Sequence, residues 1–172
     1  KKLKYITLRF GTISGYSDGM NFHTAINKFC FNAVMKIPIP IWGEALNIKR
    51  PYLSINDAYK VIKHIFRNDM YDNNTYNILS ENKTVKEIIE LLKKNKLNEK
   101  INYINSKLFN QFSYITSKAK IEKTGLKLNS KISTDIKDIL KKLIKKLIII
   151  KNLQFFLYLI FQRKKLKELL KN

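Results

Sequence analysis

Hydrophobic and polar positions along the chain follow two periods in turn, one of two residues and one of three to four. Alternation over 3–10 predicts a buried strand that stops at Gly11. After the turn-like segment 14–19, apolar residues recur at helical spacing and predict a helix over 23–36. We therefore expect a strand followed by a helix in the first part of the chain.

Further short apolar runs predict more strands, at 37–42, 52–55, 75–79 and 100–104. The first of these runs carries Pro38 and Pro40, which cannot donate to a ladder. We therefore expect that strand at an edge or outside the main sheet.

Helix starts are indicated by capping residues. Asn56 or Asp57 is expected to cap a helix that ends near Phe66, and Thr84 is expected to cap the next one. A helix over 113–123 closed by Gly125, and a long final helix capped by Ser133, complete the prediction. Strands and helices that alternate in this way indicate an α/β fold.

The last part of the chain has a different pattern. From Lys141 onward, lysines interrupt a repeat of leucine and isoleucine, and one helical face would carry Leu147, Ile150, Leu153, Leu157 and Ile160. The apolar run 147–161 is shorter than the roughly 20 residues that span a bilayer, so neither a transmembrane helix nor a signal peptide is predicted. We expect two parts, 1–145 and a basic tail at 146–172. The tail helix would face a partner or pack on itself, with an anionic membrane surface as the alternative.

The high net charge of the chain is weaker evidence for a nucleic-acid partner than its size implies. Thirty-four Lys and Arg against thirteen Asp and Glu give +21, of which +5 lies in residues 1–90 and +16 in residues 91–172. Only four of these cations are arginines, and the abundance of Lys, Asn and Ile matches an A/T-rich coding sequence. Because lysine-rich surfaces lack the forked donors of arginine, nucleic acid is disfavoured as a partner.

The cysteine and the two histidines predict neither a disulfide nor a metal site. Cys30 stands alone, which leaves no disulfide framework and fits a reducing cytoplasm. His23 and His64 are too far apart in sequence for a local ligand pair, so no metal site is predicted.

Three segments combine residue types in a distinctive order. Residues 8–15 run from a strand into a glycine turn, and residues 20–29 from a loop into a helix. Residues 38–58 hold an apolar strand, a glycine turn, Arg50, a second strand and an acidic helix start. Over about residues 3–145 this order resembles the NAD-dependent epimerase/dehydratase family, the extended short-chain dehydrogenases. The resemblance implies the C-terminal, substrate-binding portion of that fold, with short strands alternating with helices and a long C-terminal helix.

The resemblance also implies roles for particular residues. It places the Arg50 guanidinium on the diphosphate of a nucleotide sugar, with Trp42 and Tyr52 nearby, and adds Thr12 and Asn27 to the substrate site. It places Gly11 and Thr12 beside the nicotinamide of NAD. Where many relatives have an Asp after the arginine this chain has Pro51, so the sugar ligand need not be a nucleotide diphosphate.

The catalytic residues of the family are not expected in this chain. Such enzymes need a Gly-x-x-Gly-x-x-Gly loop and a Tyr-x-x-x-Lys pair on the helix before the first strand seen here. The chain has no such loop, and its pairs Tyr59/Lys63, Tyr103/Lys107 and Tyr114/Lys118 all follow that strand. We therefore expect an N-terminal half in cis or in trans to supply NAD binding and catalysis.

Other interpretations stay open at this point. The chain could be a non-enzymatic module that binds a sugar nucleotide, or a fragment of a decayed gene. It could instead be a basic protein that binds nucleic acid or a membrane surface. A homo-oligomer is also left open, and the sequence does not select among sugars or among epimerase, dehydratase and reductase reactions.

Overall fold

A computed structural model describes residues 3–95, 100–104 and 113–169 of the chain. It consists of two units, Lys1–Leu140 and Lys141–Asn172, which are described separately below. The first unit is an α/β structure of short strands and helices, as the alternating sequence pattern predicts.

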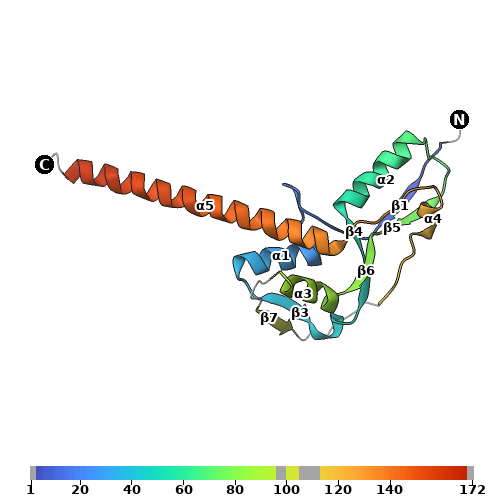
Figure 1. Ribbon diagram of the computed structural model, residues 1–172, viewed down its shortest axis with the longest axis horizontal. Helices are drawn as coiled ribbons and strands as arrows, with labels where there is room; N and C mark the ends of the chain where they lie inside the picture. Colours follow the sequence, from blue (N-terminus) through green and yellow to red (C-terminus); the bar gives the residue numbers. More distant parts are fainter. Residues whose placement is uncertain (1–2, 96–99, 105–112, 170–172) are drawn as a thin grey trace. The chain divides into compact units, whose positions relative to one another are not determined.

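The strands of the first unit form small sheets (Figure 1). Within the described residues, β1 pairs in parallel with β5, and β3 pairs in parallel with β7. The central sheet has the order β2-β4-β6, in which β2 and β4 are parallel and β4 and β6 antiparallel. The bounds are β1 Thr7–Phe10, β2 Thr12–Ser14, β3 Ile39–Trp42, β4 Lys49–Ser54, β5 Thr75–Ile78, β6 Glu81–Thr84 and β7 Ile101–Ile104.

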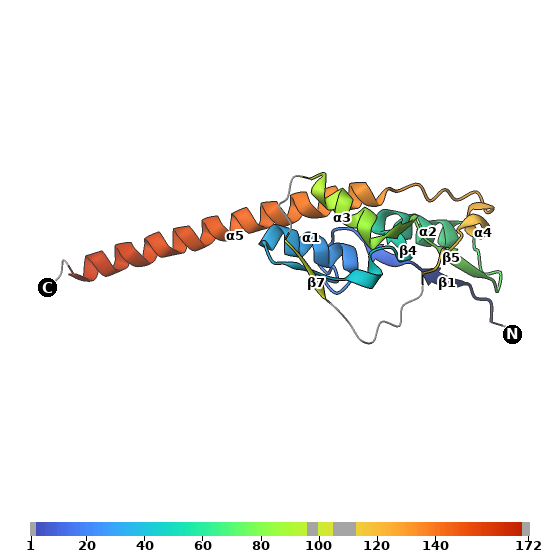
Figure 2. The same cartoon turned by 90° about the horizontal axis from the view of Figure 1, so that it is seen from below.

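Helices lie against these strands. The helix α1 contacts β3, α2 contacts β2 and β4, and α4 lies beside β5 (Figure 2). The bounds are α1 Ala25–Met35, α2 Ile55–Arg67, α3 Val85–Lys93, α4 Ala119–Glu122 and α5 Ile132–Leu169, with a 3-10 helix at Gly43–Ala45.

The core forms where β4, β5 and α2 meet. Leu53, Val61 and Ile78 are fully buried there, and Ile121 and Leu128 close the cluster from the α4 side. Apolar side chains from each strand and from one face of α2 therefore hold β4 in place, and β4 carries Arg50 and Tyr52.

Gly11 joins β1 to β2 at a point of close backbone approach. Its amide donates to the carbonyl oxygen of Ile78 at 2.9 Å. A Cβ atom at this position would lie 2.8 Å from the carbonyl oxygen of Pro51. Glycine is therefore required here because β4 passes too close for any side chain.

The start of α2 differs from the sequence prediction. Ser54, and not Asn56 or Asp57, is the N-cap, and its hydroxyl accepts from the Asn56 amide at 3.3 Å. Asp57 lies within the first turn and is fully buried. Its carboxylate accepts hydrogen bonds from Ser80 Oγ at 2.7 Å and from Ser130 Oγ at 2.7 Å. The predicted cap is thus a buried link between segments that are distant in sequence.

Several other predicted boundaries can be compared directly. Thr84 caps α3 through a full capping box with Glu87, as expected. The predicted helix at 113–123 is wrong, because α4 spans only Ala119–Glu122. Ser133 is not the cap of the final helix, since α5 already begins at Ile132. The proline-bearing strand β3 lies outside the central sheet and pairs with β7, as its prolines predict.

The second unit is the continuation of α5 from Lys141. No helix in the described part of the chain is long and apolar enough to cross a membrane. Several large apolar side chains of this unit are exposed, namely Ile144, Ile148, Ile149, Ile150, Leu153 and Phe155.

Candidate ligand-binding cavity

One cavity of about 990 Å³ gathers most of the residues singled out in the sequence. Its wall comes from the start of α1, from β3 and from β4, with single residues from β2, α3 and β7. The lining residues are Thr12, His23, Thr24, Ala25, Lys28, Phe29, Pro40, Ile41, Trp42, Ala45, Ile48, Arg50, Tyr52, Val85, Ile104 and Tyr114.

Arg50 lies on β4 beneath an aromatic ring. Its guanidinium carbon is 4.9 Å from the centroid of the Tyr114 ring, which is the geometry of a cation–π contact. Tyr114 is held over β4 because its amide donates to the Lys49 carbonyl at 3.3 Å and because the Ser113 hydroxyl accepts from the Lys49 amide at 3.1 Å. The ring therefore fixes one face of the Arg50 guanidinium.

The segment that carries Tyr114 is fastened a second time. Asn82 on β6 donates from Nδ2 to the Thr116 carbonyl at 2.9 Å and accepts from the Thr116 amide at 3.1 Å. A side-chain amide that pairs with both backbone groups of one residue acts like a short piece of strand. The strap of residues 113–116 is thus anchored to both β4 and β6 on the two sides of Tyr114.

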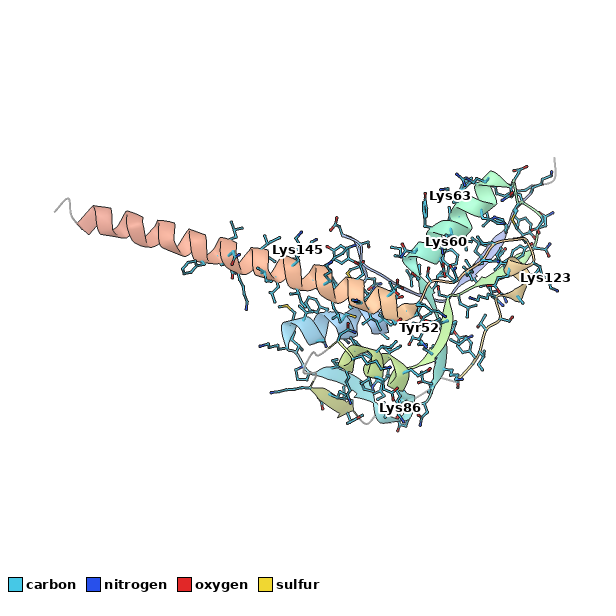
Figure 3. The ribbon with its side chains drawn as sticks, in the orientation of Figure 1. Tyr52, Lys60, Lys63, Lys86, Lys123 and Lys145 are labelled. Carbon is cyan, nitrogen blue, oxygen red and sulfur yellow. The ribbon has the colours of Figure 1, made fainter. Side chains whose placement is uncertain are left out.

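Tyr52 lies two residues beyond Arg50 on the same strand and is labelled in Figure 3. Its ring is buried, and burial raises the pKa of the phenol to about 12, against a smaller opposing effect of the Arg50 charge. Tyr52 is therefore a neutral hydroxyl at neutral pH and not a proton acceptor.

Thr12 and Trp42 present accessible polar and aromatic groups to the cavity. Thr12 pairs with Tyr52 in the β2–β4 register, which places it next to that ring. Trp42 is exposed at the end of β3. Arg50 and Tyr52 line the same cavity. Four of the predicted substrate residues therefore surround it.

Two predicted residues lie elsewhere. Asn27 is 4% exposed on α1 and is not among the lining residues of the cavity. Its Nδ2 donates to the Asn21 carbonyl at 3.0 Å, and its Oδ1 is a buried acceptor without a hydrogen bond among the described residues. Gly11 borders a second hollow of about 380 Å³, beside Arg9 and Tyr114.

The sequence did not single out Tyr114, Lys28 or His23 as site residues. Tyr114 reaches the cavity from a distant segment, so local spacing carries no signal of its contact with Arg50. The sequence does carry a signal for Lys28, because a lysine in the first turn of a helix can address an anionic ligand, and His23 directly precedes Thr24, the N-cap of α1. Among the described lining residues there are two cations, Arg50 and Lys28, and no Asp or Glu.

Comparison with known proteins finds matches in fold but not in sequence. No family model and no curated protein matches the sequence. Solved structures of sugar epimerases do match the fold, at identities that establish the fold alone. UDP-glucose 4-epimerase of Thermus thermophilus, solved with NAD, has a TM-score of 0.67 at 14% identity over 82% of this chain and 47% of its own.

Two further matches are similar. UDP-glucuronic acid 4-epimerase of Bacillus cereus, solved with UDP-glucuronic acid and NAD, has a TM-score of 0.69 at 18% identity over 84% of this chain. An epimerase of Methanothermobacter thermautotrophicus has a TM-score of 0.71 at 13% identity over 84% of this chain. This chain spans 46% and 44% of their lengths. The chain is thus similar in fold to about half of each of these epimerases.

Two glycines near the junction of β1 and β2 lie where segments of the chain pack closely. Gly11 is explained by the approach of Pro51, and a Cβ at Gly15 would clash with Ile55, so both glycines serve packing between segments of the chain. Of the Tyr-x-x-x-Lys pairs, Tyr59 is 64% exposed on α2, and the Lys118 ammonium donates to the Ser80 carbonyl at 3.1 Å. The pair Tyr103/Lys107 lies partly outside the described residues.

Proposed function

We propose that this chain is the substrate-binding portion of an NAD-dependent sugar epimerase or dehydratase, and that the cavity beside Arg50 takes a nucleotide sugar. The observation that carries the proposal is the composition of the cavity wall. Two cations without a lining carboxylate suit an anionic group, and apolar and aromatic side chains suit the remainder of the ligand. Its volume of about 990 Å³ is large enough for such a molecule.

Arg50 would hold the diphosphate. Its planar guanidinium can offer two parallel N–H donors to phosphate oxygens while Tyr114 covers one face of the group. Lys28 would add a second, less directional positive charge from α1. Thr12 would offer its hydroxyl to the sugar, with Trp42 and Tyr52 as the walls of that part of the cavity. Asn27 and Gly11 would act indirectly, through the start of α1 and the junction of β1 and β2.

The matches in fold support the choice of ligand. The Bacillus cereus enzyme was solved with UDP-glucuronic acid, and a Thermotoga maritima UDP-glucose 4-epimerase was solved with UDP-glucose. When bound, NAD would supply transient oxidation of the sugar. We assign its binding and the catalytic residues to a segment outside this chain, joined in cis or supplied in trans.

Isothermal titration calorimetry with UDP-glucose and UDP-glucuronic acid tests the proposal. We expect binding by the full chain and a dissociation constant raised about 10- to 100-fold by Arg50→Ala, the loss of one or two charge-assisted hydrogen bonds. Arg67→Ala removes the same charge from the exposed end of α2 and should bind like the unmodified chain. Absence of heat with every nucleotide sugar, or equal affinities of the two variants, would contradict the proposal.

A further inference from the structure

The second unit is strongly basic, and its single acidic residue is Glu168. Between Asp138 and Glu168 the sequence has nine Lys and Arg and no Asp or Glu. Eight of these cations form two groups, four lysines within 141–146 and four basic residues within 163–167, and Lys151 lies between the groups. Lys145, labelled in Figure 3, projects from α5 within the first group. A segment of this kind attracts a polyanionic partner.

The stretch between the two basic groups is mostly apolar, with Lys151, Asn152 and Gln154 as its polar members, and apolar side chains in its described part are exposed. Ile148, Ile149 and Ile150 are each more than half exposed, as are Leu153 and Phe155. Consecutive residues of a helix point about 100° apart, so the three isoleucines face three different directions. The apolar surface therefore surrounds the helix, and the single stripe predicted from Leu147, Ile150 and Leu153 is only part of it.

These two properties together select the partner. A second copy of the helix would cover one side only and would bring another strongly positive segment against the first. Nucleic acid would satisfy the charge but offers no hydrocarbon for the exposed isoleucines. A bilayer that contains anionic lipids offers negative headgroups and, directly beneath them, a medium that can surround the helix.

We propose that α5 from Lys141 onward binds the surface of an anionic lipid bilayer. The apolar stretch 147–161 inserts at the boundary of headgroups and acyl chains, and the two basic groups contact the headgroups on either side. At about 1.5 Å per residue the stretch is about 22 Å long, less than the roughly 30 Å of a hydrocarbon core. The helix therefore enters one leaflet. This inference is independent of the sugar-nucleotide cavity.

Flotation of the full chain with lipid vesicles tests the proposal. Vesicles of phosphatidylcholine with about one third phosphatidylglycerol should bind the protein, and pure phosphatidylcholine vesicles should bind it at least about tenfold more weakly. Lys145→Gln/Lys146→Gln/Lys151→Gln should weaken binding to the anionic vesicles about a hundredfold. The matched variant Lys86→Gln/Lys93→Gln/Lys94→Gln removes three exposed lysines at α3 and should bind as the unmodified chain does.

A second variant separates insertion from charge attraction. Ile149→Gln/Leu153→Gln keeps every charge and a good helix former at both positions, and it should weaken vesicle binding about tenfold or more. A fluorophore on Ile149→Cys should shift to the blue on anionic vesicles, and it can be placed selectively because Cys30 is fully buried. Circular dichroism checks that each variant keeps its helix.

Three results would overturn the proposal. Vesicle binding unchanged by Ile149→Gln/Leu153→Gln would show that no apolar contact is made. Tighter binding to a duplex oligonucleotide than to vesicles, at the same salt, would assign the segment to nucleic acid. Concentration-dependent self-association in sedimentation, abolished by the same double variant and without vesicle binding, would assign it to a second copy of the chain.

Discussion

Two buried carboxylates joined by serine hydroxyls link the start of α5 to the central sheet. Asp135 accepts from Ser14 Oγ at 2.7 Å and from Ser54 Oγ at 2.8 Å, while the amide of Ser54 donates to Ser80 Oγ at 2.9 Å. Ser80 in turn donates to Asp57. Both acids are almost fully buried, but their environments differ, because only Asp57 has a lysine partner, Lys60, at 2.9 Å among the described residues.

The pKa values of the two acids move in opposite directions. Burial raises the pKa of Asp135, the Ser14 and Ser54 hydrogen bonds oppose it less strongly, and the nearby Asp57 and Asp138 charges add to the rise. Burial would also raise the pKa of Asp57. Hydrogen bonds from Ser130, Lys60 and Ser80 together outweigh that effect, so its pKa is lowered. The two acids therefore have opposite consequences for stability.

The loss in the free energy of unfolding caused by Asp135→Asn should become smaller as the pH rises above about 4. Asp135 has a folded pKa above its ordinary 3.8, so the folded state binds more protons than the unfolded state between the two values. The wild-type chain therefore loses stability as the pH rises through the raised pKa, and the Asn variant does not. Urea unfolding from about pH 4 to pH 7 should show the two free energies of unfolding converging.

Asp57→Asn is the matched comparison. The lowered pKa of Asp57 puts its titration below 3.8, so its stabilising effect is complete above that pH and is lost only as the pH falls through the folded value. We expect a cost of about 2–4 kcal/mol that stays constant from about pH 4 to pH 7. Parallel curves for the two variants over this range would contradict the assignment of opposite shifts.

Tyr114 should contribute to ligand binding through its ring and not through its hydroxyl. Tyr114→Phe keeps the face that covers Arg50 at 4.9 Å, whereas Tyr114→Ala removes it. At an exposed site this contact is worth about 0.5–1 kcal/mol, so the alanine variant should raise the dissociation constant for UDP-glucose about two- to fivefold. Calorimetry that finds equal losses for both variants would assign the effect to the phenol hydroxyl instead.

Sequence reasoning identified site residues only where their surroundings are local. The resemblance implies a site role for Arg50 from a local order of glycine turn, arginine and strand, and Arg50 does line the cavity. Tyr114 was not found as a site residue, because its contact with Arg50 depends on a strap held by Asn82. Asp57 was misread as a cap, since its serine partners at positions 80 and 130 belong to other segments.

At the scale of elements, prediction succeeded where a signal lies within one turn of chain. The capping box of Thr84 and Glu87 uses only four residues, and α3 begins where it predicts. The part of the predicted helix over 113–118 does not form. Backbone groups of this segment hydrogen-bond to Lys49 and Asn82, and these bonds hold it as a strap. Tertiary hydrogen bonds override local propensity in such a segment.

Gly11 offers a test of how closely β4 passes the junction of β1 and β2. Gly11→Ala would set a Cβ 2.8 Å from the Pro51 carbonyl oxygen, and because that atom is backbone, β4 would have to shift. We expect a loss of about 1–3 kcal/mol in the free energy of unfolding. Gly19→Ala meets nothing within 4 Å and should change stability by less than about 0.5 kcal/mol. Denaturant unfolding that finds equal effects would refute the close approach.

The whole chain combines a ligand-sized cavity with a fold that covers about half the length of the similar epimerases. Its fold matches epimerases over 84% of its own length but only 46% of the length of the Bacillus cereus enzyme. The lining residues come from β2, α1, β3, β4 and the strap 113–116, among other described parts of the chain. Binding and turnover should therefore be separable, because the first needs only the cavity and the second needs a dinucleotide cradle and a proton-transfer pair.

The chain alone should bind a UDP-sugar without converting it. Incubation of saturating UDP-glucose and NAD with the chain should give neither NADH absorbance nor epimerised sugar by chromatography, because no Gly-x-x-Gly-x-x-Gly loop is present and Lys118 is engaged by a backbone carbonyl. Calorimetry on the same sample should still detect the sugar nucleotide, with Arg50→Ala as the control that loses it. Turnover that survives in Tyr114→Phe/Lys118→Ala would place catalysis in other residues of this chain. Turnover lost in that variant would return the pair to the active site and remove the need for an upstream half.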